Sequence, residues 1–198
     1  MFIDKHNTFL NVTIEQNNLA MLEKALIPAT LGTDNSTKEE AMQIQTTEHI
    51  VLLTKKSYFE MIERSIGSPL FRNLYACVGD TEKDILENGN VSCAYYVSCI
   101  LLIFKLIRAP HAMVEGTLRD MLSYGWYKSD AIQKGCVISW EDKYFIESGK
   151  TRGHIGFYVG NGIAVSNNPV TGTPQKHLYK VYMGRPLKDV YSHPLLKD

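Results

Sequence analysis

Apolar residues recur at the spacing of a helix in several stretches of the chain. This spacing predicts a helix over residues 17–27 (NNLAMLEKALI), which Pro28 ends. A second helix is predicted over residues 55–66 (KKSYFEMIERSI), just before a glycine and a proline. A third is predicted over residues 114–123 (VEGTLRDMLS), before the aromatic turn YGWY.

The longest apolar run predicts a further helix over residues 92–107, with Ser92 as its N-cap and Pro110 beyond its end. A helix that is apolar nearly all round is buried, so this segment is expected to be the central helix of the core. Shortly before it, DTEKDILENG predicts a short helix over residues 80–89, capped by its first polar residues and ended by its glycine.

Beyond these helices the pattern changes to short runs rich in β-branched and aromatic residues. The segment Gly160-Asn161-Gly162 lies between two such runs, which is typical of a β-hairpin. Helices followed by an antiparallel sheet indicate an α+β fold. Strands are predicted over residues 136–140, 154–160, 162–167 and 180–186.

The length of 198 residues suits one domain with an N-terminal elaboration. Residues 31–48 are polar and are interpreted as a surface excursion or linker. The chain is therefore divided into an N-terminal helical elaboration, residues 1–80, and a core, residues 81–198. We expect the two to form one compact unit.

Charge and composition exclude several classes of partner. Lys+Arg and Asp+Glu number 21 each, without a block of like charge, so nucleic acid is not an expected partner. The run from Ala94 to Phe104 holds 11 residues, Ser98 included. A membrane span needs about 18–20, so none is predicted. The first residues do not have the pattern of a signal peptide. The location therefore stays open between the cytoplasm and export through a removed or non-standard signal.

The four cysteines are spread too widely for a disulfide scaffold or a simple zinc site. No CxxC pair occurs, and Cys93 and Cys99 would lie roughly 120° apart around a helix. No metal and no other cofactor is therefore expected. Cys77 follows an aromatic segment and Cys99 lies deep inside the predicted central helix, so both are interpreted as core residues.

Cys93 stands at the first turn of the central helix, directly after a polar turn. A thiol becomes a strong nucleophile only as the thiolate, and the free N–H groups and dipole of a helix N-terminus stabilise that anion. A lone cysteine is more often a small buried hydrophobe, so its position alone does not decide between the two roles.

His154 begins the predicted strand HIGFYVG. Alternation along the strand places His154, Gly156 and Tyr158 on one face. The glycine next to the histidine on that face leaves room for a second group to approach. Taken alone, His154 is better explained as an exposed histidine at the end of a strand.

The two stretches together resemble the NlpC-type papain-like cysteine peptidases, over roughly residues 85–180. The features that carry the resemblance are a cysteine at the N-terminus of a buried helix and the segment His154 to Gly162, which fits H-[IV]-G-x-Y-[VI]-G-N-G. The resemblance implies a papain-like fold in which Cys93 is the nucleophile, His154 is the base and a polar residue on the next strand orients the imidazole. It implies a peptide or peptidoglycan-fragment substrate.

Two positions depart from the pattern of that family. Cys136, in KGCVISW, stands where an aspartate is common, and Ser92-Cys93-Ala94 replaces the usual Asp-Cys-Ser. Neither difference changes the proposed Cys93–His154 dyad.

The residue that orients His154 depends on the hairpin register. A two-residue loop pairs Gly156 with Asn167, whereas a three-residue loop pairs Gly156 with Ser166. A one-residue slip turns every side chain to the other face, so only one of the two can face His154. The family position favours Ser166. The chemistry of Cys-His-Asn proteases favours Asn167, to which we give the preference.

Three other polar residues are interpreted as structural. His177 is expected in a loop that faces solvent or lies beside the substrate, His111 at a helix end, and Glu141 as an exposed carboxylate at the end of a strand.

The sequence thus predicts a cysteine hydrolase. Cys93 attacks an amide carbonyl, His154 takes and returns the proton, and the Cys93 backbone N–H helps to hold the oxyanion. Two alternatives stay open: a papain-like acyltransferase that uses the same dyad, and a catalytically silent binding module.

Overall fold

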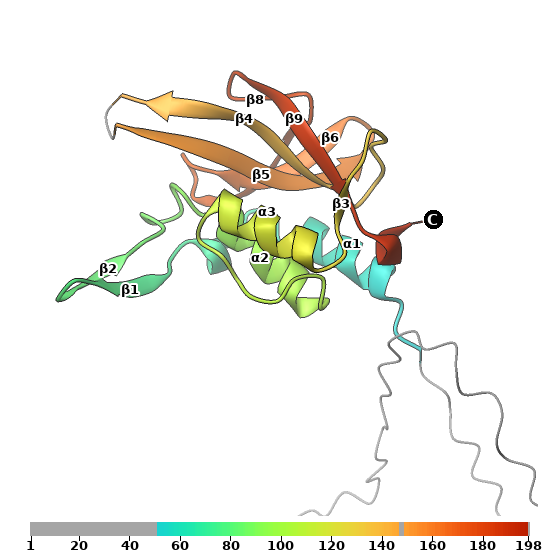
Figure 1. Cartoon of the computed structure of the whole chain (residues 1–198), viewed down its shortest axis with the longest axis horizontal. Coiled ribbons are helices and arrows are strands. Elements are labelled where there is room, and N and C mark those ends of the chain that lie inside the picture. Colours follow the sequence, from blue (N-terminus) through green and yellow to red (C-terminus); the bar gives the residue numbers. More distant parts are fainter. Residues whose placement is uncertain (1–50, 147–148, 198) are drawn as a thin grey trace, which may run out of the picture. The chain divides into compact units, whose positions relative to one another are not determined.

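Three helices lie against one side of a curved antiparallel sheet (Figure 1). The computed structural model describes residues 51–146 and 149–197, and from Thr54 onward the chain forms one compact unit. The α+β class predicted from the sequence is confirmed. The predicted helix over residues 17–27 and the polar stretch 31–48 lie outside the described residues.

The helices are α1 (Thr54–Arg64), α2 (Cys93–Ile103) and α3 (Val114–Ser123), with short 3-10 helices at Pro69–Phe71 and Pro194–Leu196. These positions confirm the helices predicted over 55–66 and 114–123. Helix α2 is shorter than predicted because Lys105 adopts a left-handed conformation, with φ of 55°. The Leu106 N–H then bonds the Leu101 carbonyl at 2.9 Å and closes the helix end.

The larger sheet has the strand order β3-β9-β4-β5-β6-β7, and β8 pairs with β9. The strands predicted over 136–140, 154–160 and 162–167 are confirmed as parts of β4, β5 and β6, except that Cys136 and Gly162 lie just before the strands. The single strand predicted over 180–186 is wrong, because a tight turn at Met183-Gly184 divides it into β8 and the start of β9. The bounds are β3 Tyr127–Lys128, β4 Val137–Phe145, β5 Lys150–Gly160, β6 Ile163–Asn168, β7 Thr173–Leu178, β8 Val181–Tyr182 and β9 Arg185–Ser192.

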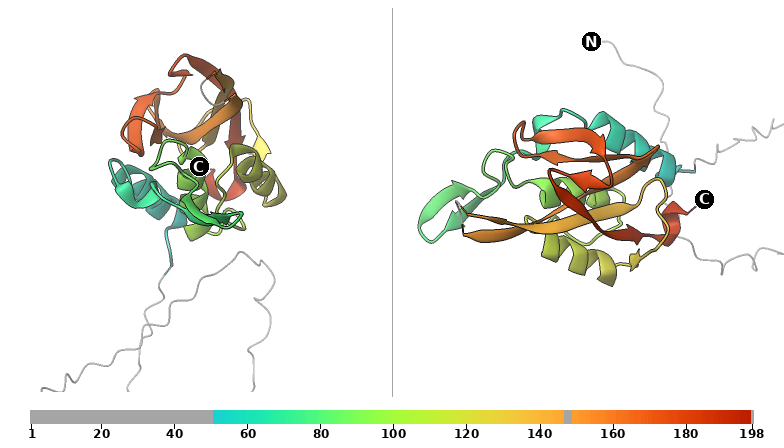
Figure 2. Two further views of the ribbon diagram at one scale, coloured as in Figure 1. Left: turned by 90° about the vertical axis from the view of Figure 1, so that its left-hand side faces the viewer. Right: turned by 90° about the horizontal axis from the view of Figure 1, so that it is seen from above.

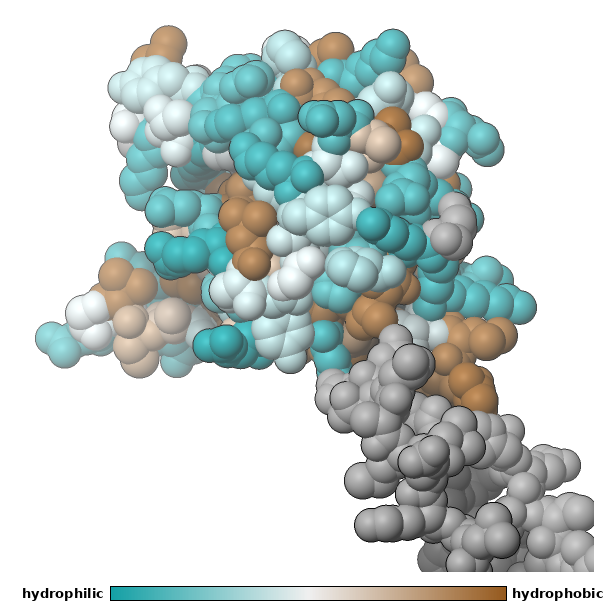
Figure 3. Space-filling view, turned by 45° about the vertical axis from the view of Figure 1, so that its right-hand side comes forward, coloured by the Kyte–Doolittle hydropathy of each residue, from teal (hydrophilic) through white to brown (hydrophobic). Residues whose placement is uncertain are grey.

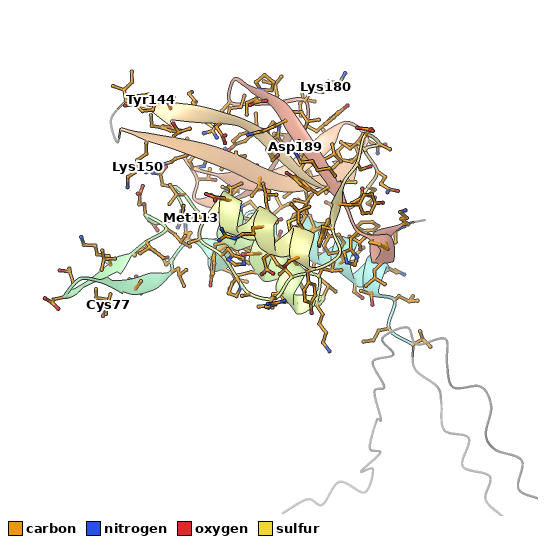
Figure 4. The ribbon with its side chains drawn as sticks, in the orientation of Figure 1. Cys77, Met113, Tyr144, Lys150, Lys180 and Asp189 are labelled. Atoms are coloured by element: carbon orange, nitrogen blue, oxygen red, sulfur yellow. The ribbon has the colours of Figure 1, made fainter. Side chains whose placement is uncertain are left out.

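The short helix predicted over 80–89 is wrong. Strands β1 (Tyr75–Val78) and β2 (Thr81–Asp84) form a hairpin there, which projects from the helical layer (Figure 1). Residues 75–78 and 81–84 are mostly exposed, and the buried Leu86 lies beyond the end of β2, so cross-strand pairing decides the conformation of residues 75–84. Cys77 lies in this hairpin and is exposed, which corrects its interpretation as a core residue (Figure 4).

The sheet is strongly curled, and both of its faces are apolar (Figure 2). The face toward the helices packs Ile155, Phe157 and Val165 against α2, which confirms α2 as the central buried helix. The inner face of the curl encloses a second cluster that contains Trp140 and Tyr182. Side chains of one strand therefore alternate between two different cores.

One face of the unit shows hydrophobic residues in small groups among hydrophilic ones (Figure 3). Within residues 51–146 and 149–197, no helix combines the length and the apolar character needed to cross a membrane.

Candidate functional site

A cavity of about 1230 Å³ opens at one end of the sheet. Its walls come from the N-terminus of α2, the start of α3 and the ends of β4, β5 and β9. Figure 4 labels two lining residues, Lys150 from the sheet and Met113 just before α3. Cys93, His154 and Asn167 all line this one cavity.

Cys93 is the first residue of α2, and no side chain caps this helix, so its first N–H groups can stabilise a charge on the sulfur. Ser92 holds the N-cap position but makes no side-chain cap, because its hydroxyl donates to the Gly89 carbonyl at 3.3 Å. The backbone N–H groups of Ile155, Ala94 and Cys93 itself interact with the sulfur and lower the pKa of the thiol. The N–H of Ile155 can point to the sulfur because no residue of β6 pairs with Ile155: the last β5–β6 pair is Phe157 with Val165.

The thiol is neutral at rest. Burial raises the pKa of Cys93 above its ordinary value. The surrounding N–H groups and the positive charge of Arg185 offset that rise only in part. Cys93 therefore requires a base that removes its proton when a substrate is present.

The register of β5 and β6 decides which residue faces His154. The hairpin loop has two residues, with Gly160 paired to Ile163, but the register shifts by one residue between Tyr158 and Gly160. Beyond the shift Phe157 pairs with Val165, which sets Ser166 opposite Gly156. The contact is so close that a Cβ on Gly156 would lie 2.6 Å from the Ser166 Cβ.

A chain of hydrogen bonds runs from His154 across three adjacent strands. The His154 Nε2 lies 2.8 Å from the Ser166 Oγ, which lies 2.7 Å from the His177 Nε2. The other ring nitrogen of His177, Nδ1, is 2.9 Å from the carbonyl oxygen of Leu178. His177 was expected in a loop; that prediction is wrong, because the residue lies in β7 and contacts Ser166.

The Leu178 carbonyl fixes the direction of every proton in this chain. A carbonyl can only accept, so the neutral His177 ring is protonated at Nδ1 and its Nε2 accepts from the Ser166 hydroxyl. The Ser166 oxygen then accepts from the His154 Nε2–H. His154 is left with an unprotonated Nδ1, the form that a general base requires.

Aromatic rings hold the two histidines in place. Tyr182 stacks on His154, with ring centroids 4.1 Å apart and planes 2° apart, and Trp140 contacts both imidazoles. Burial lowers the pKa of His154 well below its ordinary value, aided by the positive charge of Arg185. Burial also lowers the pKa of His177. Both rings are therefore neutral near pH 7.

Asn167, preferred from the sequence as the residue that orients His154, is placed elsewhere. Its Nδ2 donates to the Gly89 carbonyl at 2.6 Å, so it fastens the loop that precedes Cys93. Its Oδ1 is buried and has no hydrogen-bond partner among the described residues. The bulge in the hairpin explains the difference, because it turns Ser166 rather than Asn167 toward the histidine.

Cys93 and His154 share the cavity without touching through a hydrogen bond. Among the hydrogen bonds of the described residues, none joins the thiol to the imidazole ring. The two are connected through their neighbours: the Cys93 sulfur lies against the N–H of Ile155, which directly follows His154, and Tyr182 interacts with both side chains.

Sequence reasoning missed two residues around Cys93 and His154, namely Tyr182 and Arg185, and it gave His177 no part in orienting His154. Tyr182 and Arg185 flank the turn that divides the single predicted strand, and only the Met183-Gly184 pair could have indicated that turn. Within residues 51–146 and 149–197 no three His, Cys, Asp or Glu side chains form a group that could hold a metal ion.

Comparison with known proteins gives no relative for this chain: no protein-family model matches the sequence, and no curated protein matches it.

Proposed function

We propose that this protein is a cysteine hydrolase with a papain-like, NlpC-type arrangement, which cleaves an amide bond in a peptide or a peptidoglycan stem peptide. The observation that carries the proposal is the hydrogen-bond chain through Ser166 and His177, which leaves the His154 Nδ1 unprotonated at the cavity that Cys93 lines. This tautomer is the one that a general base acting through Nδ1 requires.

The reaction starts from a neutral thiol and a neutral imidazole. His154 accepts the Cys93 proton at Nδ1 while the sulfur attacks the amide carbonyl, and the Cys93 backbone N–H donates to the oxyanion. The C–N bond then breaks, and the imidazolium returns its proton to the leaving amine. Water, deprotonated by His154, hydrolyses the thioester, which releases a carboxylic acid and restores the thiol.

Ser166 and His177 act through His154 and are positioning residues. The Ser166 hydroxyl accepts the Nε2–H and so stabilises the imidazolium that forms during attack. Tyr182 restricts rotation of the ring by stacking on it. The proposal therefore assigns one reacting role to each of two residues, Cys93 and His154, and a supporting role to the three residues behind the imidazole.

The same dyad could transfer an acyl group to an amine instead of to water. The lining of the cavity combines charged side chains, among them Lys143 and Arg152, with apolar ones such as Val114, Leu118 and Phe145. The chemistry of the product, a free acid or a substituted amide, therefore separates the two reactions.

The test is the release of amino groups from purified peptidoglycan fragments and from a set of short peptides. We expect Cys93→Ala to abolish release, and His154→Gln to lower kcat by about 10²–10⁴-fold, the usual contribution of a general base. Mass spectrometry of a rapidly quenched reaction should show the substrate acyl group on the Cys93 peptide.

Two outcomes would contradict the proposal. A product that carries an added amine in place of a free acid would identify an acyltransferase. Absence of any acyl adduct, together with iodoacetamide labelling of Cys93 that His154→Gln leaves unchanged, would identify a silent binding module.

A further inference from the structure

The hydrogen-bond chain behind His154 ends in a second imidazole, that of His177. The first bond, between the His154 Nε2 and the Ser166 Oγ, measures 2.8 Å, and the second, between the Ser166 Oγ and the His177 Nε2, measures 2.7 Å. A hydroxyl donates one hydrogen bond and accepts another, so it can receive a proton on one side while it releases its own on the other. The two rings are therefore joined by a path along which a proton can pass.

The two imidazoles have the same ordinary pKa, about 6.5, so intrinsic basicity does not hold a proton at either ring. A carboxylate at the end of such a chain is a much weaker base and leaves the proton on the histidine. Here the terminal group is a base of equal strength. The surroundings of the two rings therefore decide which of them carries a positive charge.

The surroundings of His154 disfavour a positive charge. The residue is 6% exposed, and its ring is stacked on that of Tyr182. Burial and the positive charge of Arg185 both lower the pKa of His154. A cation on this ring would thus lie in a desolvated site beside a second cation.

The surroundings of His177 are more favourable to the charge. His177 is only half-buried, and its Nδ1 donates to the Leu178 carbonyl at 2.9 Å. This bond raises the pKa of His177 against the opposing effect of burial. When both nitrogens of His177 are protonated, the Nε2–H donates to the Ser166 oxygen and the Nδ1–H to the carbonyl, so each donor of the cation has an acceptor.

We propose that His177 is the terminal proton acceptor of the site, so that a proton entering at the His154 Nδ1 leaves its positive charge on His177. The His154 Nε2 passes its proton to the Ser166 oxygen while the Ser166 hydroxyl passes its own to the His177 Nε2. His154 stays neutral and changes from the Nε2–H to the Nδ1–H tautomer. The inference rests on the proposed function only for Cys93 as the source of the proton.

This relay separates charge across the site during the reaction. The Cys93 S–H bond breaks and leaves its electron pair on the sulfur, which bonds the amide carbon. The His154 Nε2–H and Ser166 O–H bonds also break, and new bonds to hydrogen form at the His154 Nδ1, the Ser166 Oγ and the His177 Nε2. When the amide C–N bond breaks, the transfers reverse and the His154 Nδ1 gives its proton to the leaving amine.

The test is an acid titration of the full-length protein, labelled with ¹⁵N in its histidines and followed by NMR. Protonated and unprotonated ring nitrogens have different chemical shifts, and the spectra of His154→Gln and His177→Gln assign the signals. As the first proton enters the pair, we expect both nitrogens of His177 to become protonated. At the same pH, His154 should stay neutral and exchange a protonated Nε2 for a protonated Nδ1, because the two rings titrate as one unit.

Substitutions then interrupt the path at different points. In Ser166→Ala the tautomer of His154 should no longer change at the pH at which His177 is protonated. In His177→Gln the proton has to stay on His154, which should become cationic at a lower pH than the transition of the unsubstituted protein. His193→Gln is the matched control, because it removes another histidine whose pKa burial lowers, one that lies beside the Tyr124 carbonyl rather than in the chain.

A His154 ring that is doubly protonated before His177 would overturn the relay. So would a His177 that is protonated while His154 keeps its Nε2–H tautomer, a coupling that Ser166→Ala leaves intact, or a pair that takes up no proton before the chain unfolds. The titration uses no substrate, so its result is separate from a failure of the proposed hydrolysis, which concerns turnover by Cys93. If Ser166→Ala does not fold, the titration of the unsubstituted protein decides the question.

Discussion

His154 Nε2 lies 2.8 Å from the hydroxyl oxygen of Ser166, and this contact exists because β5 and β6 shift their register by one residue beside the hairpin loop. The shift brings a hydroxyl rather than an amide to the imidazole. A hydroxyl both donates and accepts, so Ser166 can donate a hydrogen bond to His177 and accept one from His154. The carbonyl of Leu178 fixes the tautomer of His177 and thereby the direction of both bonds.

Ser166→Ala tests this chain directly. The His154 ring loses the acceptor at Nε2, so both tautomers become populated and the imidazolium loses a stabilising hydrogen bond. We expect kcat to fall by about 10- to 100-fold with KM little changed, which is part of the usual contribution of a general base. Ser192→Ala removes another buried hydroxyl of the sheet, bonded to Cys136, and should leave kcat unchanged.

Asn167→Ala separates the two residues between which the sequence could not decide. The substitution removes the shorter of the two hydrogen bonds that the Gly89 carbonyl accepts, and the Ser92 hydroxyl still donates to it, so we expect a loss of about 1 kcal/mol in the free energy of unfolding. The tautomer of His154 is unaffected, so the pH dependence of kcat should match that of the unsubstituted enzyme. A Ser166→Ala enzyme with unaltered kcat, beside an Asn167→Ala enzyme with a shifted pH profile, would reverse this assignment.

Gly156→Ala should damage the site through sterics alone. A Cβ at Gly156 would lie 2.6 Å from the Ser166 Cβ and 2.7 Å from the Val165 carbonyl oxygen, so β5 and β6 would have to move apart. We expect a loss of about 1–3 kcal/mol in unfolding free energy and a fall in kcat at least as large as for Ser166→Ala. Urea unfolding and steady-state kinetics measure the two effects.

Gly79→Ala is the control for Gly156→Ala, because Gly79 lies in the turn between β1 and β2, outside the residues that line the cavity. Apart from its chain neighbours, no atom lies within 4 Å of a Cβ built at Gly79, and its φ of 62° makes the substitution a backbone effect only. Equal losses of kcat in the two variants would show that the spacing between Gly156 and Ser166 does not matter for the site.

Local patterns sufficed for α2 and for the strand of His154, since both depend on residues close in sequence. Cys93 and His154 line one cavity. The sequence could not decide between Ser166 and Asn167 as the residue that faces His154. A one-residue bulge has no reliable local signature, yet it turns the side chains beyond it to the opposite face of the sheet. Arg185 was missed because its burial depends on Phe145 and Arg152, which are distant in the sequence.

The pH dependence of Cys93 alkylation should report its burial. The pKa of the thiol is raised, so the rate of carboxamidomethylation by iodoacetamide should rise with a midpoint at higher pH than that of cysteine in a short peptide. Arg185→Gln removes a positive charge that lowers this pKa, so it should move the midpoint further up. Site-specific mass spectrometry follows Cys93 separately from the other cysteines. A midpoint near neutral pH would mean that the thiolate is already formed at rest.

Acid should destabilise the fold from about pH 6.5 downward. Burial lowers the pKa of His154, His177 and His193 in the folded chain, whereas in the unfolded chain they titrate near 6.5. Below that pH the unfolded state binds more protons, so the free energy of unfolding falls as the pH falls. The slope is at most about 1.4 kcal/mol per pH unit for each histidine.

Asp84 acts in a separate and lower pH window. Desolvation opposes the charged form of Asp84, but backbone N–H groups of Leu74, Asn88 and Leu86 outweigh it and lower the pKa of the carboxyl to about 2. Its contribution is therefore complete above about pH 4 and is lost only as the pH falls toward 2. Between pH 7.5 and 5 the histidines alone should set the slope.

Urea unfolding at intervals from pH 7.5 to 5 measures this slope. His154→Gln and His177→Gln should each make it shallower, because each removes one group that takes up a proton on unfolding. Lys180→Gln, a surface substitution, should leave it unchanged. A free energy of unfolding that stays flat across this range would mean that His154 and His177 bind protons in the folded state as readily as in the unfolded state. A protonated His177 cannot accept the hydrogen bond of the Ser166 hydroxyl, so the tautomer of His154 would not be fixed.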